Sequence, residues 1–314
     1  MADHVSVSVG ARLHMGFLDL NFGLGRRFGS IGMAIDAPRT RITLRRAAAA
    51  EVAGHDRVRA AQYLAAVTQH LGIDDAHSLL IEEAIPPHSG LGSGTKLALA
   101  IAASVRRLHG LPGDVRADAQ VLGRGARSGV GLALFHAGGF VVDGGHGAGT
   151  ELPPVLTRLS VPSDWRVLLI LDHARSGLSG RAEKRAFATL PPQDEQDAAH
   201  ICRLVLMQLL PALAERDLPR FGQAITHIQE ICGDYFAPEQ GGRFTSSPVA
   251  AALEELRNCG AVALGQSSWG PTGFAFVPDD DTARRVAGRA REAADGTAET
   301  PVDAGPAGVS VGGT

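Results

Sequence analysis

The chain has 314 residues, of which 45% are hydrophobic and 20% are charged. This composition is typical of a globular protein large enough for two domains, and it excludes disorder for most of the chain. A net charge of −3 with only two Trp and two Tyr provides neither a basic surface nor a set of rings for base stacking. We therefore expect no nucleic-acid partner.

The cysteines and the N-terminus indicate where the protein resides. Cys202, Cys232 and Cys259 are widely spaced, which predicts neither a disulfide framework nor a zinc site. The first residues lack the basic and apolar segments of a signal peptide, and the longest apolar run, 97–105, is too short to span a bilayer. We expect a cytoplasmic protein with no membrane partner.

The first half of the chain alternates strand and helix patterns. Val5, Val7 and Val9 alternate with serines, which predicts a half-buried strand, and a second strand is expected at 40–44 after a glycine-rich loop at 21–32. The later predictions are a helix at 57–71, a strand at 78–85, helices at 95–109 and 117–123, and strands at 139–143 and 165–172.

The second half begins after a composition shift at 190–194, which we interpret as a linker between domains 1–190 and 191–314. Its predicted elements are helices at 194–215, 218–231, 248–258 (capped by Ser247) and 280–293, and strands at 262–264, 272–277 and 308–311. Residues 296–306 are poor in apolar side chains and are expected to form a mobile connection. The alternation predicts an α+β sandwich with one antiparallel sheet.

The strongest chemical signal is the segment PPHSGLGSGTKLALA at 86–100. Glycines at 90, 92 and 94 let backbone amides approach an anion, hydroxyl side chains add donors, and the following helix directs its positive end at the same place. The segment is a phosphate cradle in physical terms. It is not a Walker loop, because Lys96 lacks the GxxxxG spacing before it, and it is not a Rossmann fingerprint.

Two segments resemble motifs of the GHMP superfamily, which is named from galactokinase and from homoserine, mevalonate and phosphomevalonate kinases. PxxxGLGSG opening a helix resembles its phosphate loop, and GQSSWGPTGFAF at 265–276 resembles its C-terminal glycine motif. The resemblance implies a two-domain α+β architecture. It pairs an N-terminal β-α-β domain with a left-handed crossover and a C-terminal ferredoxin-like α/β sandwich, with the catalytic cleft between them.

A third segment departs from the kinases of this superfamily. Many of them carry a stretch resembling SGxDxxxxxxGG, whose aspartate orients or deprotonates the acceptor hydroxyl. Here the stretch reads SGVGLALFHAGG, and Gly131 stands where that aspartate would be. A glycine cannot act as a general base, so the sequence disfavours a kinase.

Six segments in order resemble one branch of the superfamily, the β-ribofuranosylaminobenzene 5′-phosphate synthase family of methanopterin biosynthesis. They are RLHMGFLDLN (12–21), FGSIGMAI (28–35), GLGSGTKLALA (90–100), RSGVGLALFHAGGFVVDGG (127–145), RSGLSGRAEKRAF (175–187) and SSWGPT (267–272). The resemblance implies a decarboxylating phosphoribosyltransferase. Such an enzyme joins phosphoribosyl pyrophosphate to 4-aminobenzoate or 4-hydroxybenzoate and releases pyrophosphate and carbon dioxide.

The chemistry that the resemblance implies points to candidate site residues. We expect Asp19, Arg12 and His14 to be catalytic, and a Mg²⁺ ion to be held by Ser93 and Asp19. Arg12 and Arg175 would pair with the 5′-phosphate or the benzoate carboxylate. The residues expected to bind substrate are Ser89, Gly90, Leu91, Gly92, Ser93, Gly94, Thr95, Ser128, Gly129, Arg175, Ser268, Trp269, Gly270 and Thr272.

Purely structural interpretations stay open beside these assignments. His14 could be a structural histidine, and Trp269 could simply fill the domain interface. Two other functions also remain: an ATP-dependent GHMP small-molecule kinase with a displaced base, and a ligand-binding paralogue that has lost catalysis. A homodimer is expected from the resemblance alone, and the sequence leaves the amine or hydroxyl of the acceptor undecided.

Overall fold

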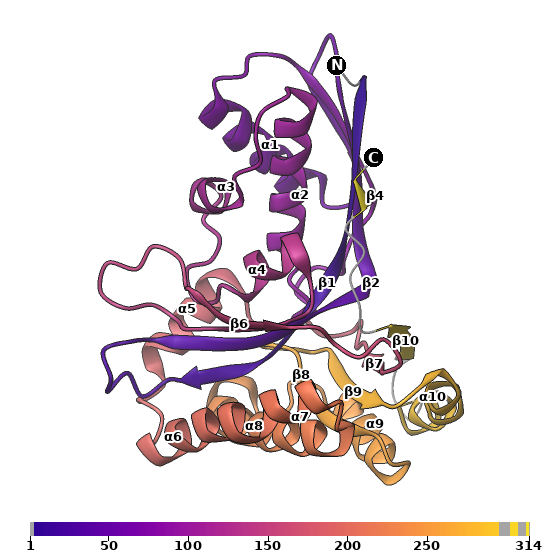
Figure 1. The fold of residues 1–314 in the computed structure, drawn as a ribbon. Coiled ribbons are helices and arrows are strands. Elements are labelled where there is room, and N and C mark those ends of the chain that lie inside the picture. The colour runs from indigo at the N-terminus through magenta and orange to yellow at the C-terminus, as the bar shows by residue number, and fades with distance from the viewer. Residues whose placement is uncertain (1–2, 295–301, 307–311, 314) are drawn as a thin grey trace.

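The computed structural model describes residues 3–294, 302–306 and 312–313. Two antiparallel-rich sheets, each with its own helices, form an upper N-terminal part and a lower C-terminal part in Figure 1. The expected two-domain α+β architecture is confirmed.

Within the described residues, seven strands make the N-terminal sheet. Its main path runs β11-β1-β2-β4-β3, and β5 pairs with β2 and β6. The strands are β1 (His4–Asp19), β2 (Phe28–Arg46), β3 (Glu51–Gly54), β4 (His77–Glu83), β5 (Phe140–Asp143), β6 (Val155–Leu159) and β11 (Gly312–Gly313). The short β3 and β6 were not predicted, because neither shows a sustained alternation of apolar and polar residues.

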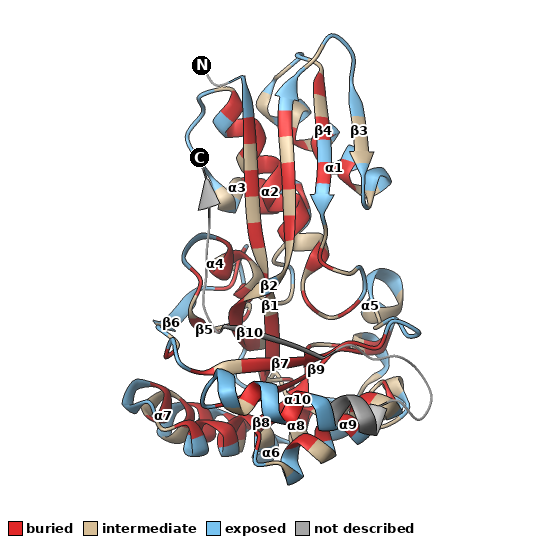
Figure 2. Ribbon diagram, turned by 90° about the vertical axis from the view of Figure 1, so that its right-hand side faces the viewer, coloured by how far each residue is buried: buried red, intermediate tan, exposed pale blue. Residues whose placement is uncertain are grey.

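Strand β1 changes its burial pattern along its length, as Figure 2 shows. Val5, Val7 and Val9 are buried and the serines between them are half-buried, as the alternation predicted. From Leu13 to Phe17 every residue is buried. This lower part of the strand is covered on both faces, because α6 and α8 of the C-terminal part also contact β1.

Helices α1 (Arg57–Leu71), α2 (Ser93–Leu108), α3 (Val115–Val121) and α4 (Val130–Ala137) cover one face of this sheet (Figure 1). Helix α2 is the central one, and its predicted apolar stripe is buried at Leu97, Ile101, Val105 and Leu108. Helix α4 was not predicted, because the glycine-rich segment around it was interpreted only as a motif.

The C-terminal sheet has the order β10-β7-β9-β8 and is antiparallel. Its strands are β7 (Arg166–Ile170), β8 (Val262–Gln266), β9 (Gly273–Val277) and β10 (Val302–Pro306). The helices of the remaining chain are α5 (Gly180–Thr189), α6 (Glu195–Leu204), a π-helical turn (Val205–Leu209), α7 (Leu210–Glu215), α8 (Leu218–Gln240), α9 (Ser247–Asn258) and α10 (Asp280–Ala294).

Several details differ from the sequence predictions. Residues 302–306 form β10 instead of a mobile connection, because they pair with β7. Helix α8 continues past residue 231 to Gln240, because Cys232 and Phe236 extend its buried face. Ser246, not Ser247, caps α9 by accepting a hydrogen bond from the Val249 amide. The strand predicted at 308–311 lies outside the described residues.

The strand pairing does not follow the expected boundary at residue 190. Strand β7 precedes that position in the chain, yet its two neighbours are β9 and β10. One apolar cluster also joins both parts, because Leu13 and Met33 of the N-terminal sheet share it with Leu169 of β7 and Phe221 of α8. The two sheets are therefore parts of one packed unit.

The continuous helical stretch Glu195–Glu215 could cross a membrane by length and mean hydropathy alone. In this structure α6 contacts β1 and α8, and 39% of the most apolar window is buried. Core helices of soluble proteins meet the same criteria, so this helix is weak support for a membrane span.

Candidate active site

The predicted phosphate cradle opens helix α2. Gly90 and Gly92 adopt left-handed φ angles of 80° and 81°, which side chains rarely tolerate. Gly92 precedes the helix, and its carbonyl accepts hydrogen bonds from the amides of Thr95 and Lys96 at 3.1 Å each. The free amides of the first helical turn and the helix dipole then favour an anion at this end.

Two distant segments hold the cradle. The Arg12 amide donates to the Leu91 carbonyl at 3.2 Å, and the Ser267 hydroxyl donates to the Gly90 carbonyl at 2.8 Å. The same hydroxyl accepts from the His14 amide at 3.1 Å. A Cβ at Gly90 would lie 2.1 Å from the Ser267 carbonyl oxygen, so only glycine fits there. Strand β1, the cradle and the turn after β8 are therefore interlocked at the junction of the two parts.

A cavity of about 520 Å³ opens over the cradle, within the range of small-molecule sites. Its walls come from β1, α1, α2, α5, the loop before α4 and the turn after β8. Among the residues that the structure describes, Glu183 is the one carboxylate that lines it. The cationic side chains that line it are Arg12, Arg59, Arg124, Arg127 and Lys184. Such an excess of cations suits a polyanionic ligand.

Glu183 is the acid of this cavity, and its environment is mixed. Burial raises the pKa of its carboxyl above the usual value, while the neighbouring charges of Arg127 and Arg12 and a hydrogen bond from Trp269 act in the opposite direction. Glu183 forms an ion pair with Arg127. The ion pair therefore holds the Glu183 carboxylate, which projects from α5, near the cradle.

Arg12 and His14 lie on the cavity wall with altered ionisation. Burial lowers the pKa of Arg12 to about 10, so the guanidinium stays charged at neutral pH, and it donates to the Gly90 carbonyl. Burial, and the charge of Arg12, lower the pKa of His14 to about 3. The imidazole is therefore neutral, and it places no positive charge on this wall.

Lys96 lies directly behind the cradle and does not line the cavity. Its side chain is 1% exposed, and its ammonium is 5.9 Å from the Phe135 ring. Burial, and the charge of Arg12, lower its pKa to about 7. The cradle thus has a cation beneath it that is easily neutralised.

The structure brings most of the predicted site residues into one place. Those that line the cavity are Arg12, His14, Gly90, Gly92, Ser93, Gly94, Thr95, Ser128, Ser268, Trp269 and Gly270. Ser89, Leu91, Gly129 and Thr272 do not line it and are buried behind these segments. Of these four, the Gly129 amide donates to the Asp143 carboxylate at 2.8 Å, which anchors the start of α4.

Asp19 and Arg175 are two predictions that the structure places elsewhere. Asp19 ends β1, and the extended chain separates it from Arg12 by roughly 20 Å. Its carboxylate accepts hydrogen bonds from the amides of Asn21 at 2.7 Å and Phe22 at 3.0 Å, so it stabilises the turn after β1. Arg175 is exposed and donates to the Thr245 carbonyl. Neither residue lines the cavity.

Known proteins of this fold match the chain. Residues 57–139 match the family described as GHMP kinases N terminal domain, and residues 209–296 match GHMP kinases C terminal. A mevalonate kinase of L. major in complex with R-mevalonate has a TM-score of 0.74 at 15% identity, covering 98% of this chain and 97% of the kinase. A homoserine kinase from Cytophaga hutchinsonii has a TM-score of 0.68 at 18% identity, covering 99% and 98%. At these identities the likeness shows the fold.

Relatives closer in sequence show the family. A protein of Archaeoglobus fulgidus named beta-ribofuranosylphenol 5′-phosphate synthase is 33% identical over 279 residues, which are 85% of this chain and 86% of the relative. The chain belongs to the beta-ribofuranosylphenol 5′-phosphate synthase family. A second member, from Methanothermobacter thermautotrophicus, is 29% identical and covers 93% of this chain and 94% of the relative. The predicted family is confirmed, and the chain is an enzyme of it.

Gly131 lies on α4 against the cradle. A Cβ there would be 3.2 Å from the Thr95 methyl group, so a larger side chain would press on the phosphate loop. The names of the sequence relatives do not favour the kinase alternative.

Trp269 and neighbouring aromatic rings close one wall of the cavity. Trp269 is 4% exposed, and its ring centroid lies 4.4 Å from that of Phe236 and 5.5 Å from that of Phe187. Phe17 belongs to the same cluster and also lines the cavity. Trp269 therefore fills the junction between the two parts and borders the site at the same time.

Sequence reasoning missed the charged residues of α1, α5 and the loop before α4. Arg127 and Arg175 both begin an RSG sequence, and only Arg127 reaches the cavity. Because the chain has 28 arginines, an arginine by itself did not indicate a site residue. The spacing of Glu183 after RSGLSG was the one available hint, because this motif belongs to the synthase resemblance.

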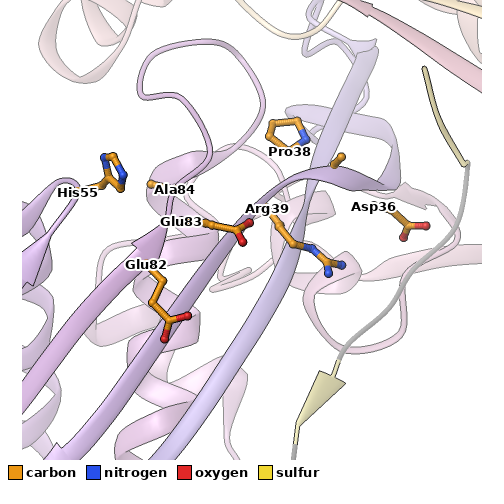
Figure 3. Close-up of a pocket in the computed structure, with 8 residues that line it drawn as sticks. Asp36, Pro38, Arg39, His55, Glu82, Glu83 and Ala84 are labelled. Atoms are coloured by element: carbon orange, nitrogen blue, oxygen red, sulfur yellow. The ribbon is translucent and has the colours of Figure 1, made fainter. Parts of the chain in front are cut away.

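A second hollow, of about 720 Å³, lies beside β2, the end of β4 and the turn after β3 (Figure 3). It shares no lining residue with the cradle cavity, and none of the predicted site residues lines it. Figure 3 shows the carboxylates of Asp36, Glu82 and Glu83 beside Arg39 and His55, so this hollow lacks the excess of cations found at the cradle cavity. Its lining is Asp36, Ala37, Pro38, Arg39, His55, Glu82, Glu83 and Ala84.

Proposed function

We propose that the protein condenses phosphoribosyl pyrophosphate with 4-aminobenzoate or 4-hydroxybenzoate and releases pyrophosphate and carbon dioxide. The observation that carries this proposal is the cavity itself. It joins a backbone phosphate cradle, surrounded by cations, to an aromatic wall, and Gly131 leaves no carboxylate at the position of the kinase base. The names of the archaeal relatives agree with a C-riboside product.

The cradle would bind the leaving group. Pyrophosphate departs from the anomeric carbon with the electron pair of the broken carbon–oxygen bond, and negative charge grows on its oxygens. Amides at the start of α2 and the guanidinium of Arg12 are fixed before substrate arrives, so they can stabilise that charge without reorganising.

The acceptor would attack the resulting oxocarbenium-like centre with its carboxylate-bearing ring carbon. A carbon–carbon bond forms there, and loss of carbon dioxide returns an electron pair to the ring, so aromaticity is restored without net proton transfer. Phe17 and Trp269 offer flat surfaces that would hold the arene in the cavity. The neutral imidazole of His14 adds no positive charge that would oppose the developing cation.

Mg²⁺ is proposed to accompany pyrophosphate, and oxygen donors of the cavity fit that ion. Ser93, Thr95 and Glu183 would hold it together with phosphate oxygens, because Mg²⁺ prefers a few protein oxygens with phosphate and water. Asp19, the carboxylate first expected for this role, lies outside the cavity. Among the described residues no three His, Cys, Asp or Glu side chains cluster as a metal site. When bound, the ion would neutralise charge on the leaving group.

The proposal is tested by incubating the protein with phosphoribosyl pyrophosphate, Mg²⁺ and each carboxyl-labelled acceptor in turn. Labelled carbon dioxide should be released with at least one acceptor, and the better substrate identifies the para group. ATP should neither replace the donor nor raise the melting temperature. ATP-dependent phosphorylation of a metabolite alcohol without release of carbon dioxide would contradict the proposal, and tight binding without turnover would favour the paralogue.

A homodimer in the cytoplasm also remains a proposal, based on the family resemblance. Light scattering coupled to size-exclusion chromatography should give a mass near twice 32.7 kDa. A mass near 32.7 kDa at all concentrations would contradict it.

A further inference from the structure

Three hydrogen-bond donors converge on one point beside Gly94, in the first turn of α2. A Cβ placed on Gly94 would lie 3.3 Å from Arg59 Nη1, 3.4 Å from Arg124 Nη1 and 3.7 Å from the Tyr63 hydroxyl oxygen. The missing side chain of Gly94 leaves that point open, and Gly94, Arg59 and Arg124 all line the cradle cavity.

The two arginines carry donors that the protein itself does not satisfy. The Nε atoms of Arg59 and Arg124 are both buried, and neither has a hydrogen-bond partner within the described part of the chain. The contacts of Arg59 with Asp56 and of Arg124 with Tyr63 both use Nη2, so the Nη1 groups that approach Gly94 can donate to a ligand in the cavity.

Contacts on the outer side hold these guanidinium groups in place. Arg59 forms an ion pair with Asp56 within the first turn of α1. Arg124 donates to the Tyr63 hydroxyl, and its guanidinium carbon lies 5.1 Å from the centroid of that ring. Because the Tyr63 oxygen accepts this hydrogen bond, its own proton is free to point elsewhere. The group is therefore arranged before any ligand binds.

We propose that Arg59, Arg124 and Tyr63 bind a terminal phosphate group of the sugar-phosphate donor, beside Gly94 and apart from Arg12. The identity of the donor rests on the function proposed above. Two planar guanidinium forks and a hydroxyl around one point match the several oxygens of a phosphate dianion. The nearby carboxylate of Asp56 is already paired with Arg59, so it does not neutralise both arginines.

The donor has two groups of this chemistry, the terminal phosphate of its pyrophosphate and its 5′-phosphate. Arg12 lies over Gly92, where a Cβ would be 3.1 Å from its Cγ, whereas Arg59 and Arg124 lie over Gly94. The cradle thus has two cationic sides, and a ligand with more than one phosphate can contact both. Pyrophosphate and ribose 5-phosphate, used as separate probes, distinguish the two sources.

The first experiment measures binding of each probe by calorimetry to wild-type protein, Arg59→Gln, Arg124→Gln and Arg107→Gln. Arg107 is an exposed arginine near the far end of α2 and serves as the matched control. Each cavity variant should weaken binding of at least one probe by about tenfold or more, because it removes a charged donor to phosphate. Arg107→Gln should change neither affinity. A selective loss for one probe identifies which phosphate occupies the site.

The second experiment adds a methyl group beside the proposed phosphate position. Gly94 has no left-handed φ, so Gly94→Ala is compatible with its helical backbone, and the methyl would press on the Nη1 atoms of both arginines and displace them. Gly288→Ala, in the exposed part of α10 where a Cβ meets no other atom, is the control for the same change. Gly94→Ala should keep the wild-type melting temperature and lose about tenfold or more in affinity for the same probe.

Unchanged affinities for both probes in Arg59→Gln, Arg124→Gln and Gly94→Ala would overturn the phosphate site, as would a wild-type protein that binds neither probe. These measurements need no turnover. If the variants weaken phosphate binding while the wild-type protein releases no carbon dioxide from either labelled acceptor, the site stands and the proposed reaction fails.

Discussion

The ammonium group of Lys96 lies in the apolar packing beneath the cradle, where burial lowers its pKa to about 7. A depressed folded-state pKa means that the folded protein prefers the neutral amine. The contribution of this group to stability is therefore present above pH 10.5 and is lost as the pH falls toward 7.

We predict that Lys96→Met is more stable than the wild-type protein at pH 6, by several kcal/mol. The difference should shrink by about 1.4 kcal/mol per pH unit between pH 7 and 9, as deprotonation relieves the wild-type protein. Urea unfolding at a series of pH values measures it, with Lys184→Met at the exposed second lysine as the control. A difference that does not change with pH would contradict the buried, titrating amine.

The sequence predicted some of the individual site residues correctly and missed others. Glycines 90, 92 and 94 were recognisable because a phosphate loop needs backbone access, and Arg12 because it belongs to a motif. Asp19 belongs to the same motif, but seven further residues of extended strand carry it away from the cradle. Arg59 and Arg124 are brought to Gly94 only by the packing of α1 and α3 against α2, which no local pattern encodes.

At the scale of elements, the start of α9 gives a sharp test. The Ser246 hydroxyl accepts from the Val249 amide at 3.3 Å and donates to the buried carboxylate of Asp172 at 2.6 Å. Ser246→Ala should lower the free energy of unfolding by about 1–3 kcal/mol, because it removes a cap and leaves a buried carboxylate short of a donor. Ser247→Ala, one residue on and exposed, should change it by less than about 0.5 kcal/mol. Chemical unfolding of both variants measures these changes. Equal losses in the free energy of unfolding would contradict the assignment of Ser246 as the cap.

Helices with a clear apolar period were predicted, whereas several strand bounds were not, since β2 begins at Phe28 inside the segment 21–32 that was predicted as a loop. Helices α1 and α2 carry regular apolar stripes and strong stop signals, so their existence was evident. Strands β3 and β6 have four and five residues and depend on pairing with β4 and β5, which are distant in sequence. The prediction that Ser247 caps α9 was wrong by one residue. Both positions are serines, and they differ only in their backbone angles.

On the scale of the whole molecule, one apolar cluster joins the N-terminal sheet to β7, β9 and α8. We predict a single cooperative unfolding transition, because neither part can lose its packing without exposing the core of the other. Far-UV circular dichroism and tryptophan fluorescence should give coincident urea curves, since Trp165 and Trp269 are both buried. Two separated transitions would show that the parts unfold independently.

The overall architecture followed from the resemblance, while the boundary at 190 followed from composition and did not anticipate that β7 joins the later sheet. Pairing of β7 with β9 spans about a hundred residues, beyond the reach of any local signal. The site depends on the same assembly, because Ser267 of the later part fixes Gly90 of the cradle.

The most direct measurement of the central claim is the ratio of labelled carbon dioxide to pyrophosphate released by the wild-type protein from phosphoribosyl pyrophosphate and carboxyl-labelled acceptor. Carbon–carbon bond formation with decarboxylation predicts one carbon dioxide for each pyrophosphate, and no carbon dioxide when either substrate is omitted. Release of pyrophosphate without carbon dioxide, with either acceptor, would mean hydrolysis or transfer to oxygen or nitrogen, and would contradict the account.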